Sequence, residues 1–165
     1  MPDAPRGVVV VDTTPIIALS IIGQLQLLEA LYGEVWIPPA VNAEVMAGGS
    51  RPGAAELQRA AFVRVAVLAD PSQADMLSDL DRGEAEVIAL AREQQSGLVI
   101  LDERLARRHA MRLGLTVTGV LGVLIQAKRQ GHVEAVRPLL DQLRAGGIHL
   151  DDGLIQTTLA LAGET

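Results

Sequence analysis

The sequence predicts an α/β protein built as a three-layer α/β/α sandwich, and two observations support this fold class. Short aliphatic runs alternate with helical segments along the 165 residues, the pattern of parallel strands joined by helical crossovers. Two runs, at residues 8–11 and 98–101, contain no polar residue, which indicates strands buried on both faces. No internal repeat or low-complexity tract divides the chain, so we expect one domain over residues 1–165.

The first strand leads directly into a helix. Thr14 is a suitable helix N-cap and Pro15 is favoured at the first helical position, so Asp12 is expected at the turn between strand and helix. Glycines at 23 and 33 bound a second short helix. Further strands are expected at 35–37, 62–68, 98–101 and 115–118, which gives a mainly parallel sheet of about five strands. Further helices are expected at 40–46, 54–61, 83–94, 104–113, 119–130, 133–144 and 152–161, the last docked on the domain.

Composition restricts the chemistry that the protein can use. The chain has no Cys and only one Trp, one Tyr and one Phe, which excludes disulfides, thiolate catalysis and Cys-based zinc sites and disfavours a site that stacks bases on aromatic rings. The N-terminus lacks a signal-type pattern, and no apolar run approaches the roughly 18 to 20 residues that span a membrane. We therefore expect a cytoplasmic protein with an aliphatic core and no membrane contact.

Charge is distributed unevenly. A net charge of −6 argues against uniform electrostatic attraction to nucleic acid. A local basic cluster nevertheless occurs in one short segment, which contains Arg104, Arg107, Arg108 and Arg112. This cluster fits either phosphate contacts or an ordinary solvated helix face.

Two carboxylates stand out because each ends a buried strand. Asp12 follows residues 8–11 and Asp102 follows residues 98–101. Burying a charge is unfavourable unless it gains a partner, and ligand sites of open α/β sheets lie at the carboxyl ends of the strands. We therefore expect both side chains to belong to a site at that edge of the sheet.

Helical acids could complete this site. Glu84 begins the helix before the fourth strand and shares a face with apolar residues, whereas Glu86 lies about 200° away around the helix; this favours Glu84. Taken singly, Glu84 also fits a carboxylate that stabilises the helix dipole, and Glu44 fits a solvated helix acid. Thr13, Thr14 and Glu103 are candidates to support the site or to cap the turn.

A cluster of carboxylates has a characteristic chemistry. Like charges raise each other's pKa values unless a cation compensates them, and hard oxygen ligands suit Mg²⁺ or Mn²⁺. Such an ion polarises a phosphoryl oxygen and activates water, which is what phosphodiester hydrolysis requires. The sequence has no glycine-rich dinucleotide or P-loop motif, and an aspartyl-phosphate mechanism would need an acid at position 14, which is Thr14.

Several segments in order resemble a bacterial and archaeal branch of the PIN-domain nucleases. The resemblance rests on VVVVDTTPIIALSIIGQLQLLEALYGEVWIPPAVNAEV, RPG, RGEAEVIALA, LVILDERLARRHAMRLGL, TGVLGVLIQAKRQG and VRPLLDQLRAGG, which together span nearly the whole chain. It implies a PIN-like fold and an acidic pocket that binds Mg²⁺ or Mn²⁺ and cleaves RNA.

The resemblance also implies roles for individual residues. Asp12, Glu44, Glu84 and Asp102 match the four acids of the family. Where many relatives have two Asp after the fourth strand, this chain has Asp102 followed by Glu103, which keeps the charge on a longer side chain. Because some relatives have Asn at the first acid, the retained Asp12 favours a competent site.

The leading hypothesis is a metal-dependent ribonuclease in which the arginine cluster contacts RNA phosphates. PIN proteins include VapC-type toxins, so a small antitoxin is one expected partner. The alternative is a catalytically inactive PIN-like module that acts through protein or RNA contacts. We also expect a homodimer, because apolar residues in the short helices of residues 16–31 and in the C-terminal helices exceed the evident need of a small core.

Overall fold

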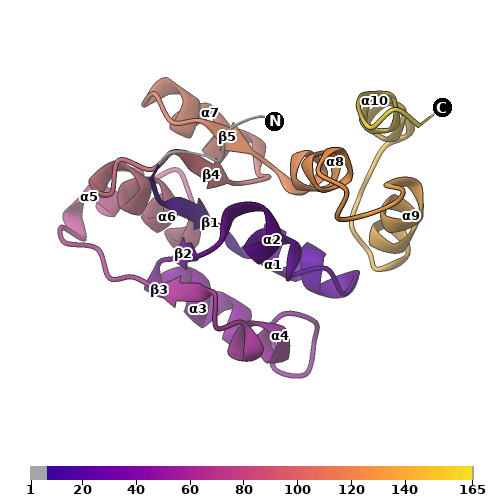
Figure 1. Ribbon diagram of the computed structural model, residues 1–165. Coiled ribbons are helices and arrows are strands. Elements are labelled where there is room, and N and C mark those ends of the chain that lie inside the picture. The colour runs from indigo at the N-terminus through magenta and orange to yellow at the C-terminus, as the bar shows by residue number, and fades with distance from the viewer. Residues whose placement is uncertain (1–6, 165) are drawn as a thin grey trace.

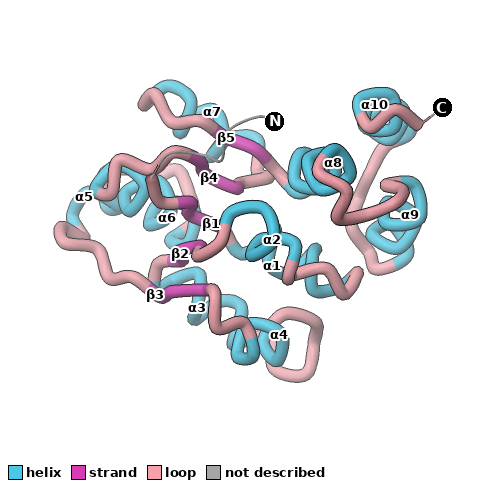
Figure 2. The backbone as a smooth tube through the Cα atoms, viewed as in Figure 1, coloured by secondary structure: helices cyan, strands magenta, loops and turns pink. Residues whose placement is uncertain are grey.

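A computed structural model describes residues 7–164 and contains the predicted parallel sheet (Figures 1 and 2). All strand pairs are parallel, and the order across the sheet is β3-β2-β1-β4-β5. The strands are β1 (Val9–Val11), β2 (Val35–Ile37), β3 (Val63–Val65), β4 (Leu98–Ile100) and β5 (Val117–Thr118). This five-stranded sheet flanked by helices confirms the predicted α/β/α class.

Two groups of helices flank the sheet (Figure 1). In one group, α6 packs on β1 and β4 and contacts α3 and α5. In the other group, α8 packs against α1, α2, α10 and β5, and α9 against α1. The helices are α1 (Thr13–Ile21), α2 (Leu27–Tyr32), α3 (Pro39–Met46), α4 (Ala54–Arg59), α5 (Ser72–Asp75), α6 (Arg82–Glu93), α7 (Arg104–Arg112), α8 (Val120–Arg129), α9 (Arg137–Ala145) and α10 (Asp152–Leu161).

The two central strands carry the most deeply buried part of the sheet. Every residue of β1 and β4 is buried, as expected for strands covered by helices on both faces. Their register pairs Val10 with Val99, and the Ser96 hydroxyl donates a 2.6 Å hydrogen bond to the Val8 carbonyl at the start of the pair. At the other end, the Asp12 N–H donates to the Ile100 carbonyl at 3.0 Å. Hydrogen bonds therefore join β1 and β4 at both ends of the strand pair.

The bounds of several predicted elements were wrong. The helix expected at 133–144 begins at Arg137, and the strand expected at 115–118 is limited to Val117–Thr118. Helix α1 begins at Thr13 with Asp12 as its N-cap residue, so Thr14 is not the cap and Pro15 is not the first helical residue. The strand expected at 62–68 is restricted to Val63–Val65. It is an edge strand with one neighbour, and Val67 beyond it is 76% exposed, so the apolar pattern there does not mark a buried strand.

The N-terminal segment, which we expect to lack a signal sequence, includes residues 1–6, and these lie outside the described residues. Within residues 7–164, no helix combines the length and the apolar character that a membrane crossing requires.

Candidate functional site

The strand order determines where a site can form. The chain passes from β1 outward to β2 and β3 and then returns to β4 on the opposite side of β1. At such a reversal of strand order, the crossover connections leave a crevice at the carboxyl ends of the two strands. Asp12 directly follows β1, and Asp102 comes two residues after β4. The two strand-end acids predicted from the sequence therefore lie at this crevice.

Asp12 is a buried carboxylate with unfavourable surroundings. Only 4% of the residue is exposed, and its side chain does not cap α1 with a hydrogen bond. Burial raises the pKa of Asp12 from its usual 3.8 to about 7, a shift that the Thr13 N–H opposes in part and that the negative charges of Glu84, Asp81 and Glu44 increase. Asp12 thus lies among three other carboxylates that come from α3 and the start of α6.

Gly83, in the first turn of α6, marks the point at which these side chains converge. A methyl group on Gly83 would lie 3.1 Å from Oε2 of Glu44 and 3.5 Å from Oδ1 of Asp81. It would lie 3.7 Å from Oδ1 of Asp12. We call Asp12, Glu44, Asp81 and Glu84 the acidic cluster.

A capping box fixes Glu84 at the start of α6. The Glu84 N–H donates to Oδ1 of Asp81 at 2.8 Å, and the Asp81 N–H donates to Oε1 of Glu84 at 3.1 Å. This reciprocal arrangement satisfies two backbone donors at a helix N-terminus. Burial raises the pKa of Glu84 to about 7, with added repulsion from Asp81 and Glu103 and an opposing hydrogen bond from the Asp81 backbone. Glu84 therefore stabilises the N-terminus of α6 and also lies among the carboxylates around Asp12.

Glu44 reaches the cluster from the exposed side of α3. Its Oε2 accepts a 2.9 Å hydrogen bond from the hydroxyl of Thr13, which is 5% exposed. Thr13 therefore orients the carboxylate of Glu44. Thr14, the neighbouring candidate, is exposed in the first turn of α1.

Asp102 lies at the same sheet edge, but its carboxylate faces α8. The Val120 N–H donates to Oδ1 and Oδ2 of Asp102 at 3.1 and 3.3 Å, so Asp102 caps the start of that helix. Burial raises the pKa of Asp102, whereas the Val120 N–H and the charge of Arg107 lower it. The structure therefore brings Glu44 and Glu84 to Asp12 but directs Asp102 to the other side of the crevice. Glu103 accepts from the Ala106 N–H at 2.9 Å and caps α7.

The acidic cluster has no cationic partner in the described part of the chain. Across residues 7–164, no Lys, Arg or His forms an ion pair with any of its four members. Within the same residues, no group of three or more Asp, Glu or His side chains is arranged so that it could hold a metal ion. The donor set itself, carboxylate oxygens supported by a hydroxyl, fits Mg²⁺ or Mn²⁺.

Sequence reasoning did not find Asp81. Its position three residues before Glu84, at the start of an apolar helix, is the signature of an N-terminal cap, and this obscured its proximity to Asp12. Glu86, which the helix geometry disfavoured, faces away from the cluster: it accepts from the Ala40 N–H at 3.1 Å and pairs with Arg82 at 2.8 Å.

The predicted arginine cluster lies beside Asp102. Three of its members, Arg104, Arg107 and Arg108, line a groove of about 600 Å³ together with Asp102 and residues of α8 and α10. Arg107 also donates to the Leu101 carbonyl at 2.8 Å, whereas Arg112 does not line the groove. Positive charge is therefore available next to one of the strand-end acids.

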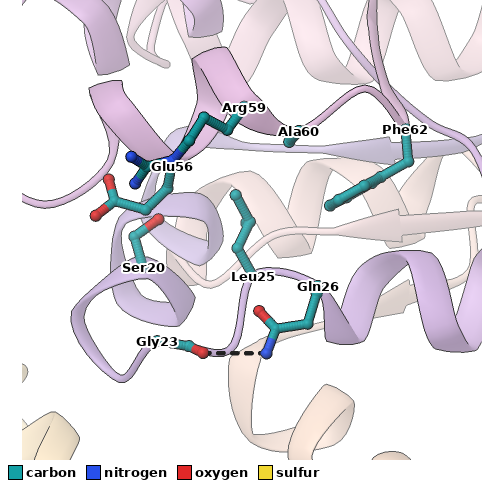
Figure 3. Close-up of a pocket in the computed structure, with 8 residues that line it drawn as sticks. All are labelled: Ser20, Gly23, Leu25, Gln26, Glu56, Arg59, Ala60 and Phe62. Atoms are coloured by element: carbon teal, nitrogen blue, oxygen red, sulfur yellow. Dashed lines mark hydrogen bonds between the residues drawn. The ribbon is translucent and has the colours of Figure 1, made fainter.

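A separate hollow of about 260 Å³ lies between the end of α1 and α4 (Figure 3). It is bounded by Ser20, Glu56, Arg59 and Phe62, among others, and the Gln26 amide closes one side by donating to the Gly23 carbonyl at 3.2 Å. None of the four clustered acids borders this hollow, so it is distinct from the candidate site.

Comparison with known proteins agrees with the fold. A family model described as PIN domain matches residues 8–164, which include every member of the acidic cluster. A comparison with curated proteins finds no match.

Proposed function

The chain belongs to the PIN-domain family, and from this premise we propose that it is a Mg²⁺- or Mn²⁺-dependent ribonuclease. PIN domains are generally nucleases that use divalent metals. The observation that carries the proposal is the acidic cluster, in which Asp12 is almost fully buried among carboxylates without a cationic partner in the described residues. Burial is the main cause of its raised pKa and the neighbouring carboxylates add to it; a divalent cation would stabilise the ionised form against both.

Each residue of the site has a distinct task in this proposal. Asp12, Glu44 and Glu84 would hold the cation, and Asp102, whose carboxylate accepts the Val120 N–H, would take part from the end of β4. The Thr13 hydroxyl fixes one oxygen of Glu44 through its 2.9 Å hydrogen bond. When bound, the cation supplies a Lewis acid for the phosphoryl oxygen and lowers the pKa of a water nucleophile. No Ser or Cys nucleophile is required.

The groove beside Asp102 supports single-stranded RNA as the substrate. Arg104 and Arg108 come from one helix, and the planar guanidinium group binds two oxygens of one phosphate at once. Phosphate contacts position the strand without determining its sequence. An RNA bound in this groove would place a phosphodiester next to Asp102.

A small antitoxin and a second copy of the chain are proposed as partners. The groove combines arginines with the exposed apolar residues Met111, Leu154 and Leu161, a surface suited to an amphipathic segment of a small antitoxin. Size-exclusion chromatography with light scattering over a range of concentrations tests the homodimer. A monomer mass at every concentration would exclude it.

Cleavage of a fluorescent single-stranded RNA by purified protein tests the activity. We expect cleavage with Mn²⁺, none with EDTA, and none by Asp12→Asn or Asp102→Asn, whose circular dichroism should match the wild type. Asp151→Asn, a change at the N-cap of α10, serves as the matched control and should cleave normally. Unchanged cleavage by both site variants would show that the site is assigned wrongly. Inactivity of the wild type with correct metal binding would instead favour a non-catalytic module.

A further inference from the structure

We propose that the hollow between the end of α1 and α4 binds a free α-amino acid with an apolar side chain (Figure 3). The hollow is separate from the proposed nuclease site, because neither the acids around Asp12 nor the arginines of the groove beside Asp102 border it. Three features carry the proposal: a buried hydroxyl without a partner, two opposite charges beside that hydroxyl, and an apolar wall next to them.

The Ser20 hydroxyl is the first feature. It is the only buried side-chain oxygen or nitrogen of residues 7–164 that lacks a hydrogen-bond partner, and Ser20 is only 6% exposed. Buried polar groups are nearly always paired, because an unpaired one costs the free energy of its lost hydration. Such a hydroxyl, at the wall of a hollow, is a place where a ligand can supply the missing partner.

The helix itself could have satisfied this hydroxyl. Serine and threonine in a helix can donate to the carbonyl four residues earlier, as Thr157 and Thr158 do in α10. Ser20 makes no such bond. Its Oγ points instead toward Glu56 and Arg59, which line the same hollow (Figure 3).

Glu56 and Arg59 bring opposite charges to this side of the hollow. Both come from α4, and Oε2 of Glu56 accepts the Gly53 N–H at 2.8 Å. Within residues 7–164, neither side chain forms an ion pair, with the other or with a third residue. A zwitterionic ligand matches this arrangement: its carboxylate would bind the guanidinium group and the Ser20 hydroxyl, and its ammonium group would bind Glu56.

The apolar wall is formed by Leu25, Ala60 and Phe62. Leu25 and Ala60 are buried and Phe62 is half-buried, and all three lie beside the charged residues (Figure 3). An apolar ligand side chain placed against this wall would remove further apolar surface from water. Charge and apolar surface are thus arranged as the two ends of an apolar amino acid are.

The size of the hollow restricts the ligand further. Its volume is about 260 Å³, slightly below the roughly 300 to 1,000 Å³ of sites for drug-sized molecules. A compact ligand is therefore favoured. A nucleotide fits the charges less well, because its phosphate would lie beside the carboxylate of Glu56.

Isothermal titration calorimetry of the full chain in EDTA tests the choice of ligand. L-leucine and L-phenylalanine are compared with L-glutamate, with AMP, and with 4-methylpentanoate and isopentylamine, which are leucine without its ammonium group and without its carboxylate. We expect leucine or phenylalanine to bind and every other probe to bind at least about 10-fold more weakly. Absence of binding by both apolar amino acids, or equal binding of leucine and either truncated analogue, would overturn the proposal, as would tighter binding of AMP.

Two substitutions test the residues. Ser20→Ala removes a hydroxyl that has no partner, so it should weaken binding of the preferred amino acid about 3- to 10-fold without lowering the melting temperature. Arg59→Gln should weaken this binding at least about 10-fold. Arg92→Gln is the matched control, because Arg92 is an exposed arginine in the last turn of α6 as Arg59 is in α4.

Unchanged affinity in both Ser20→Ala and Arg59→Gln, or an equal loss in Arg92→Gln, would show that the ligand does not bind in this hollow. Asp12 lies outside the hollow, so Asp12→Asn should bind the amino acid as the wild type does. The proposed nuclease activity and the proposed amino-acid site can therefore fail independently of each other.

Discussion

Replacing Asp12 with Asn should stabilise the metal-free protein while destroying its proposed activity. In the wild type, a carboxylate that is 4% exposed lies next to Glu84, Asp81 and Glu44. Asn has nearly the same shape and no charge, so the variant removes the repulsion and most of the desolvation penalty. Improved stability with lost function is the expected behaviour of a residue kept for its chemistry.

The pKa of Asp12 gives the size of the effect. Each pKa unit corresponds to about 1.4 kcal/mol, so keeping Asp12 ionised with a pKa of about 7 instead of 3.8 destabilises the folded state by up to about 4 kcal/mol. The Asn amide must still be desolvated, which reduces the expected gain to about 2 to 4 kcal/mol. For a chain of this size, 2 kcal/mol raises the melting temperature by roughly 4 to 8 °C.

The gain in stability of Asp12→Asn over the wild type should increase with pH. Because the folded-state pKa lies above the unfolded value, the folded wild type binds more protons between pH 4 and 7, and its stability falls as the pH rises through this window. The free energy of unfolding of Asp12→Asn should therefore exceed that of the wild type by the full margin of about 2 to 4 kcal/mol at pH 8 and by almost nothing near pH 4.

Urea unfolding in EDTA at pH 8, 6 and 4.5 measures this margin. Asp141→Asn, at an exposed position of α9, is the control and should change the free energy of unfolding by less than about 0.5 kcal/mol. An Asp12→Asn variant that is no more stable than the wild type at pH 8, or a margin that is independent of pH, would refute the reasoning.

Three other changes test neighbouring parts of the site. Acidification of the metal-free wild type from pH 8 to 5 should raise its urea midpoint, because two buried carboxylates have a pKa of about 7; a constant midpoint would contradict this. Gly119→Ala should destabilise the fold by about 1 to 3 kcal/mol and abolish cleavage, because the added methyl group would collide with Asp102; Gly153→Ala in α10 is the control and should do neither. Replacing Arg104 and Arg108 with Ala should weaken RNA binding and lower the salt dependence by about 0.7 in slope for each lost phosphate contact; an unchanged slope in a filter-binding assay would place the RNA elsewhere.

The sequence predicts the residues at the ends of the central strands better than those on helices. Asp12 and Asp102 follow uninterrupted apolar runs, and in a parallel sheet the strand direction alone places such residues at one edge. The apolar runs predict the five strands and the apolar spacing predicts the final helix over 152–161, although the strand expected at 62–68 is limited to Val63–Val65. The family match over residues 8–164 confirms the family resemblance.

The orientation of side chains depends on packing that the pattern does not contain. Glu44 joins Asp12 because α1 and α3 are in contact and Thr13 donates to it, while Asp102 faces away because the free Val120 N–H is a better partner than another carboxylate. The proximity of Asp81 to Asp12 was missed because an aspartate three residues before Glu84 is expected only to cap the helix. These assignments require the distances between helices.

The order of the strands has a consequence for synthesis of the protein. β1 is made first, but β4, its neighbour on one side, follows only after residue 97. The Ser96 hydroxyl that joins the two strands donates across 88 positions of sequence. Asp12 and Glu44 are therefore synthesised more than 50 residues before β4, and a chain that lacks β4 has no carboxyl edge between β1 and β4. The crevice at the carboxyl ends of β1 and β4 therefore forms only after more than half of the chain has been made.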